Sequence, residues 1–375
     1  MLEEATIRYI LNLTNGHSGY RLELKRLRFL GTGELRLLRR LVINPSMTQA
    51  ALANSLDVSR SAINQIWKKL HRDFDLSIRS TLDYGKIGFR LVFGWAKDKE
   101  GSTAIPKFKQ WLSSNALTSV VAESALSSLM DKRVYFEAFL PPDTRGRMFL
   151  EQVSRFEKRP YNLGITYGLS DNVSNSMNLG LFDGRKWEVL DGFRFGAIID
   201  SARTYADILP DAILSYHTSP AQTNVDDLLV ASSLEENYHV TSRELQHRYD
   251  EFGYSAPSER TLRRRLDSLR RSHATPYVSI HNVGLTQRFV VCLQEHRGES
   301  TISRLLQAQA TTLPKARVVK TDELTAMILD LPESASWFAI SKAFSELGSD
   351  IPEMCTFIAE SFQLWKGLAS LVPPL

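Results

Sequence analysis

The chain carries one short pattern of helix, turn and helix twice, and this repetition constrains its fold more than any other feature. Residues 48–70 read TQAALANSLDVSRSAINQIWKKL, and residues 241–269 read TSRELQHRYDEFGYSAPSERTLRRRLDSL. When Ser59 is aligned with Ser258, apolar residues coincide at Ile63 and Leu262, at Trp67 and Leu266, and at Leu70 and Leu269. A pattern that recurs along a chain indicates a repeated architecture, so we predict a tandem duplication.

The residues that follow each pattern are also alike. The β-rich runs IGFRLVFGWA (87–96) and RFVVCLQEH (288–296) each follow a glycine, and we expect each to be the first strand of a ferredoxin-like domain that comes after a wing. Further β-like runs are 119–124, 133–140 and 162–169 in the first copy, and 316–321, 325–331 and 355–362 in the second. Helical apolar spacing surrounds Phe108, Phe149, Ile302 and Trp337. The predicted fold class is α+β, with two winged helix-turn-helix domains, each followed by a ferredoxin-like (βαββαβ) domain.

This interpretation divides the chain into six parts. They are an N-terminal extension (1–33), a first winged helix-turn-helix domain (34–82), a first ferredoxin-like domain (83–184), a connector (185–224), a second winged helix-turn-helix domain (225–280) and a second ferredoxin-like domain (281–375).

The first helix-turn-helix has the small and apolar residues that such a unit needs. Ala53 provides space where the two helices cross, and Asp57 lies at the turn, where a left-handed backbone is required. Ser59 is a suitable N-cap for the second helix. Because Ile63, Ile66, Trp67 and Leu70 form the buried stripe, the polar residues lie on the opposite face. The residues expected to contact DNA are Ser59, Arg60, Ser61, Asn64, Gln65, Lys68 and Lys69.

The second helix-turn-helix is more basic. Thr241 and Glu244 are spaced as a capping box, and a longer turn (252–258) follows the first helix. Residues 259–271 contain six arginines but only two acidic residues, although the whole chain has a net charge of only +4. Such a run should attract phosphate in a salt-dependent way. The residues expected to contact DNA are Ser258, Arg260, Thr261, Arg263, Arg264 and Arg271, whereas Arg265 lies nearer the buried stripe and is expected to pair internally.

Both units also allow a plainer interpretation. The first could be an ordinary amphipathic helical hairpin, and the arginine run could be a solvated charged face. The position of the arginines on a predicted recognition helix favours nucleic-acid contact.

Motifs for catalysis, metals or cofactors are absent from the sequence. There is no P-loop, no GxSxG, no HExxH and no CxxC, so we expect no catalytic residues, no metal and no cofactor. Cys292 and Cys355 are expected to be small buried residues, and His281 and His296 to be surface or wing residues. Two cysteines and an acidic start without a long apolar run predict a cytoplasmic protein with no membrane partner.

The order of these elements resembles that of the Lrp/AsnC (feast/famine) family of transcription regulators. The residues that carry the resemblance are 49–70 with DYGKIGF (83–89), and VDDLLVASSLEENYHVTSREL (225–245) with SERTLRRRLDSL (258–269). The resemblance implies binding of double-stranded DNA and a small-molecule effector such as an amino acid. It also implies pairing of the ferredoxin-like domains, so that the two halves would pair within the chain as a pseudo-dimer. It also allows a homo-oligomer. No stretch matches an effector-binding motif, so the effector residues stay unknown.

The function predicted from these observations is that of a DNA-binding transcription regulator that reads two unlike half-sites and is not an enzyme. One alternative is an enzyme that resembles the sirohaem decarboxylases, which use the same plan on tetrapyrroles. Such an enzyme would need histidines and arginines converging on a ferredoxin-like sheet, and the sequence does not indicate this. The other alternative is an effector sensor that does not bind DNA.

Overall fold

The computed structural model describes residues 29–99, 103–125, 132–170, 173–188, 224–295, 312–335, 353–360 and 364–372, together with residues 304, 307 and 310. Two three-helix units are present. The first contains α2 (Thr32–Ile43), α3 (Gln49–Leu56) and α4 (Arg60–Phe74). The second contains α8 (Val225–Glu236), α9 (Ser242–Glu251) and α10 (Glu259–Ser272).

Local sequence signals set the ends of these helices. Asp57 has a φ of 53°, which confirms the left-handed turn between α3 and α4. The Ser59 side chain accepts a hydrogen bond from the backbone N–H of Ala62 at 3.1 Å and so caps α4. Thr241 and Glu244 form the expected capping box at the start of α9.

The strands that follow the two units pair with each other. β1 (Ser77–Leu82) and β7 (Ala274–Ser279) run antiparallel, with Ser77 opposite Ser279, and form a two-stranded ribbon. The expectation of a wing at this point is therefore wrong. The run at 87–96 starts at the last residue of the 3₁₀ turn η1 (Gly85–Ile87) and contributes the first strand of a large sheet, as expected. Each three-helix unit thus shares a β-ribbon with the other unit.

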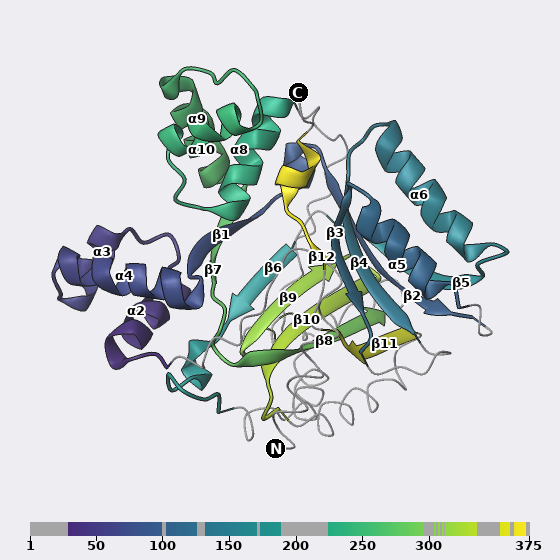
Figure 1. Cartoon of the computed structure of the whole chain (residues 1–375), viewed down its shortest axis with the longest axis horizontal. Coiled ribbons are helices and arrows are strands. Elements are labelled where there is room, and N and C mark those ends of the chain that lie inside the picture. Colours follow the sequence, from purple (N-terminus) through teal and green to yellow (C-terminus); the bar gives the residue numbers. More distant parts are fainter. Residues whose placement is uncertain are drawn as a thin grey trace, which may run out of the picture.

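The first large sheet has the expected strand and helix order. β2 (Arg90–Asp98), α5 (Ile105–Ser114), β3 (Thr118–Glu123), β4 (Arg133–Leu140), α6 (Thr144–Glu157) and β5 (Leu163–Ser170) follow one another, and the strands lie in the order β3-β4-β2-β5. Helices α5 and α6 cover the outer face of this sheet (Figure 1). Phe108 of α5 packs edge-on against Phe136 of β4, with the ring centroids 5.6 Å apart.

The second large sheet repeats this strand order. It contains β8 (Leu285–Gln294), β9 (Lys315–Lys320), β10 (Leu324–Pro332) and β11 (Glu353–Ile358) in the order β9-β10-β8-β11. The helices expected near Ile302 and Trp337 lie outside the described residues, apart from helical positions 304, 307 and 310.

Each half also supplies an edge strand to the sheet of the other half. β6 (Val173–Met177) follows the first sheet in sequence but pairs with β9 of the second, with Val173 opposite Val319. β12 (Leu364–Trp365) follows the second sheet but pairs with β3 of the first. The 3₁₀ turns η2 (Leu179–Leu181) and η3 (Leu368–Leu371) come next and pack against α2 and α8 respectively. Residues 83–184 and 281–375 therefore do not form two self-contained sheets.

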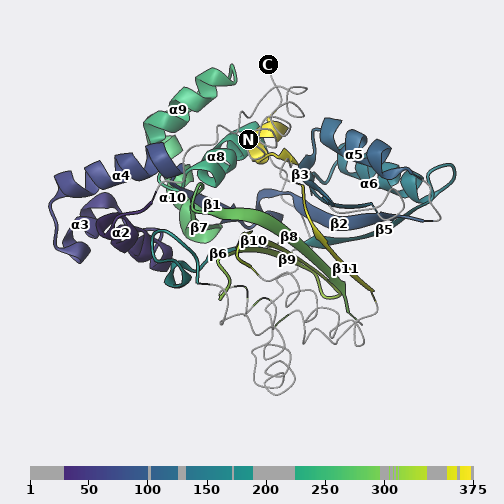
Figure 2. The ribbon, with the colours of Figure 1, turned by 60° about the horizontal axis from the view of Figure 1, so that its bottom comes forward.

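The two large sheets pack face to face and share a core (Figure 2). One buried cluster contains Trp95 and Tyr135 from the first sheet with Val290 and Ile328 from the second. At its centre Arg317 donates to Glu137, with Nε 3.0 Å from Oε1. No helix in the described part of the chain is long and apolar enough to cross a membrane.

Candidate functional site

The predicted DNA-contacting residues of the first unit lie on the outer face of α4. Arg60, Ser61, Asn64, Gln65 and Lys68 are all exposed. Two predicted residues have structural partners instead. The Ser59 hydroxyl caps the helix, and Lys69 forms an ion pair with Glu34 of α2.

On α10 the predicted residues divide in the same way. Arg260 and Arg264 are exposed and have no hydrogen-bond or ion-pair partner among the described residues. Arg263 lies 3.3 Å from Glu259, and Arg271 donates to the backbone oxygen of Asp267. Ser258 caps the helix, and its hydroxyl lies 2.9 Å from that of Thr261.

Two further arginines of this run bind inside the unit. Arg265 donates to Asp226 at 2.8 Å, which confirms the internal pairing expected for it. Arg270 donates to the backbone oxygens of Tyr238 and Val240, so it holds the start of α9 against α10. The exposed arginines of α10 without a carboxylate partner among the described residues are therefore Arg260, Arg264 and Arg271, and the first two have no hydrogen-bond partner either.

The two three-helix units lie at the same end of the molecule, around the ribbon and away from α5 and α6 (Figures 1 and 2). A shallow cavity between them is lined by Ser46 and Thr48 of the first unit and by residues 238–242 of the second. The two outer faces thus belong to neighbouring units rather than to opposite ends of the protein.

A second polar site lies between the ribbon and the inner face of the second sheet, where the sequence did not indicate one. This cavity of about 200 Å³ is lined by cationic side chains from three strands. They are Arg79 of β1, Arg288 of β8, and Lys315 and Arg317 of β9, with His281 beside them. Histidine and arginine side chains therefore do converge on a sheet, contrary to the expectation from the sequence.

Ion pairs hold most of these cations. Arg288 Nε lies 2.6 Å and Lys315 Nζ 3.0 Å from the Asp330 carboxylate. Burial opposes ionisation of Asp330, but the two cations outweigh it and hold the pKa of Asp330 well below its usual range. Burial likewise opposes the charge of Arg317, but Glu137 outweighs it and raises the pKa of Arg317.

The two cysteines are buried, as expected, and face each other across β8 and β11. Burial raises the pKa of Cys292 well above its usual value and that of Cys355 to about 11, so both thiols stay protonated near neutral pH. His281 is exposed, as expected, but it lines the polar cavity, and His296 lies outside the described residues.

A half-buried carboxyl joins the second three-helix unit to the end of the described chain. Glu235 of α8 accepts hydrogen bonds from the backbone N–H of Leu368 at 2.6 Å and from the Tyr84 hydroxyl at 3.1 Å. Burial raises the pKa of Glu235 above its usual value, against the effect of these donors. The folded state therefore binds a proton at this carboxyl more tightly than the unfolded state does.

Replacing Glu235 by glutamine is expected to change how stability depends on pH. Because the folded pKa is raised, the wild type loses stability as the pH rises above the unfolded pKa of about 4.3, and glutamine cannot ionise. The difference in Tm between variant and wild type should therefore shift in favour of the variant between pH 4 and pH 8, as measured by thermal unfolding. Glu157→Gln, at an exposed position at the end of α6, is the control. A Tm difference that does not change with pH would contradict the prediction.

The comparisons with known proteins give likenesses in structure but not in sequence. No family model and no curated protein matches the chain. Among solved structures, the siroheme decarboxylase NirDL has a TM-score of 0.49 and 12% identity, over 89% of this chain and 92% of its own. The values for its complex with an iron-uroporphyrin III analogue are the same.

Smaller proteins match part of the chain. The Pyrococcus furiosus transcriptional regulatory protein PF0864, a member of the AsnC family, has a TM-score of 0.25 and 18% identity, over 37% of this chain and 88% of its own. PH0061 has a TM-score of 0.27 and 21% identity, over 39% of this chain and 96% of its own. The prediction that the chain is not an enzyme is contradicted, because the structures that cover most of it are those of a decarboxylase.

Proposed function

We propose that this chain binds double-stranded DNA as a transcription regulator, with α4 and α10 contacting two unlike half-sites. The observation that carries the proposal is the outer face of α10, where Arg260 and Arg264 are exposed without a partner among the described residues. Arginines in this state can neutralise phosphates without breaking an internal ion pair. The amide and basic groups of Asn64, Gln65 and Lys68 on α4 suit contacts with base edges and phosphates.

The pairing of the halves supports two unlike half-sites within one chain. The ribbon holds the two units together, so their recognition helices have a fixed relation to each other. Because α4 and α10 differ in sequence, the two halves of the DNA site should differ as well.

The Arg260→Ala/Arg264→Ala double variant is expected to bind DNA more weakly. Loss of two phosphate contacts should reduce the slope of log K against log salt by about 1.8, and affinity at about 0.1 M salt by more than about tenfold. Anisotropy titrations of the chain's own upstream region, at several salt concentrations and with excess competitor DNA, measure both quantities. Unchanged affinity and slope would refute the role of α10.

A matched control is available on the far side of the molecule. Arg147→Ala/Arg155→Ala removes the same charge from exposed positions on α6, away from both three-helix units (Figure 1). Its affinity and salt slope should stay close to those of the wild type. An equal loss in both double variants would mean that only the net charge of the chain matters.

The convergence of Arg79, Arg288, Lys315 and His281 favours a second candidate, an enzyme that acts on a tetrapyrrole carrying carboxylates. Cationic side chains of this kind bind carboxylates, and the cavity of about 200 Å³ would take one carboxylate arm rather than the whole ring. Titration with iron-uroporphyrin III, followed by absorbance and by release of carbon dioxide, tests this function. No spectral change at a ligand excess would exclude it.

A further inference from the structure

The polar cavity has no counterpart in the first large sheet, although the strands are arranged alike. A Leu-Pro pair stands at the end of both β4 (Leu140-Pro141) and β10 (Leu331-Pro332). When these pairs are aligned, Phe139 corresponds to Asp330. The cross-strand partner of Phe139 is Leu91, and that of Asp330 is Arg288. On the other side of Phe139, its backbone N–H donates a hydrogen bond to the backbone oxygen of Leu117. The corresponding neighbour of Asp330, on β9, is Lys315.

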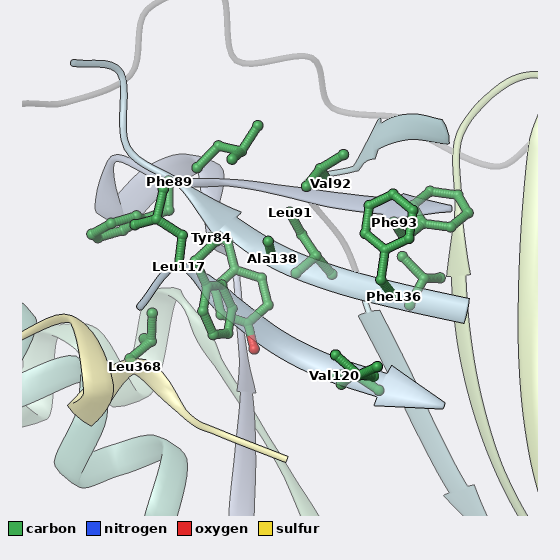
Figure 3. Packing of buried hydrophobic residues seen from close by; sticks show 14 of the residues in the cluster. Tyr84, Phe89, Leu91, Val92, Phe93, Leu117, Val120, Phe136, Ala138 and Leu368 are labelled. Atoms are coloured by element: carbon green, nitrogen blue, oxygen red, sulfur yellow. The ribbon is translucent and has the colours of Figure 1, made fainter. Parts of the chain in front are cut away.

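In the first sheet these positions are filled with apolar side chains. Leu91, Leu117 and Phe139 are buried, and Tyr84 and Leu368 pack beside them (Figure 3). The fold therefore does not require charged residues at these positions. Burying the charged residues Arg288, Lys315 and Asp330 of the second sheet costs free energy. A ligand that binds to them would give these residues a function.

The cavity has more positive than negative charge. Asp330 is the one carboxylate among its lining residues, and it already binds Arg288 and Lys315. The charge of Arg317 is neutralised by Glu137 of β4, in the first sheet. Arg79 lies on the ribbon next to the Tyr277 hydroxyl, and the acidic group that interacts with its charge, Glu235, is not among the residues that line the cavity.

An unused donor lies in the same place. The side-chain nitrogen of Asn175, on the exchanged strand β6, is buried and has no hydrogen-bond partner among the described residues. A buried amide without a partner costs free energy, and an acceptor bound in the cavity would remove this cost.

We infer that this cavity binds a small acid with two or more carboxylates, which accept hydrogen bonds from Arg79, Lys315 and the Asn175 amide. Its volume of about 200 Å³ lies below the range of about 300–1,000 Å³ that is usual for drug-sized ligands, so a small metabolite fits better. An α-amino group would add a further cation next to the arginines. A simple dicarboxylate should therefore bind more tightly than the corresponding amino acid.

The inference is independent of DNA binding, because it can be tested without DNA. Isothermal titration of the full chain at constant ionic strength would compare succinate, aspartate and inorganic phosphate. We expect succinate to bind at least about tenfold more tightly than aspartate, since they differ only in the amino group. Phosphate binding as tight as that of succinate would show a general anion site and overturn the inference, and so would the absence of succinate binding.

Variants then locate the site. Arg79→Met should weaken succinate binding at least about tenfold, because it removes a charge-assisted hydrogen bond. Asn175→Leu should weaken it to a smaller extent and serves as a second test if Arg79→Met does not fold. Arg147→Met, on the exposed face of α6, is the control. Equal affinity in the wild type and in the folded site variants would overturn the assignment.

Discussion

Replacing Glu137 by alanine is expected to lower the free energy of unfolding by about 3–5 kcal/mol, the largest effect of a single polar substitution in this chain. Glu137 is fully buried, and Arg317, its partner across the two sheets, is 8% exposed. Arg317 Nη2 lies 2.5 Å from Glu137 Oε2, and the Tyr135 hydroxyl donates to the same carboxylate at 2.8 Å. Loss of the carboxylate leaves a buried guanidinium without a counter-charge.

Urea unfolding followed by tryptophan fluorescence measures this effect. Glu251→Ala removes an exposed carboxylate that lies 3.5 Å from Arg248, and its effect should stay within about 0.5 kcal/mol. The Glu137→Leu/Arg317→Met double variant should regain most of the lost stability, because apolar residues of similar volume can replace a buried ion pair. A loss below about 1 kcal/mol in Glu137→Ala would mean that water reaches Arg317.

Replacing Phe108 by alanine is the second substitution with a large expected effect, also about 3–5 kcal/mol. The ring is fully buried between α5 and the first sheet. Its centroid lies 5.0 Å from that of Phe156 on α6 and 5.6 Å from that of Phe136 on β4, so one side chain joins two helices to the sheet. Truncation removes these contacts and leaves a cavity.

The same unfolding measurement tests this substitution. Phe108→Leu keeps part of the apolar volume, so it should lower the free energy of unfolding clearly less than Phe108→Ala does. Phe29→Ala is the control for loss of an aromatic ring, because Phe29 is 57% exposed. If the two alanine variants lost equal stability, Phe108 would not be the centre of this packing.

The sequence predicted the features that depend on neighbouring residues. The left-handed turn at Asp57, the cap at Ser59 and the box at Thr241 and Glu244 each involve residues at most three positions apart. The helices around Phe108 and Phe149 followed from their apolar periodicity, because that periodicity reflects the face each helix buries.

Features that join distant parts of the chain were not predictable in this way. Arg317 and Glu137 are 180 residues apart, and each occupies a strand position that an apolar residue could fill equally well. The cationic cavity draws on β1, β8 and β9, so no short stretch contains its pattern. The ribbon was mistaken for a wing because a strand after a helix-turn-helix has the same local sequence signal in either arrangement.

The exchange of edge strands sets an order in which the protein can be completed during synthesis. The first sheet receives β12, which contains residues 364 and 365, so its edge stays open until nearly the whole described chain has left the ribosome. The edge strand of the second sheet, β6, precedes the other strands of that sheet in the sequence, so it is translated before them. A ribosome-bound first half therefore exposes the edge of β3 to other nascent chains, whereas β6 can cover the edge of β9 as soon as β9 forms.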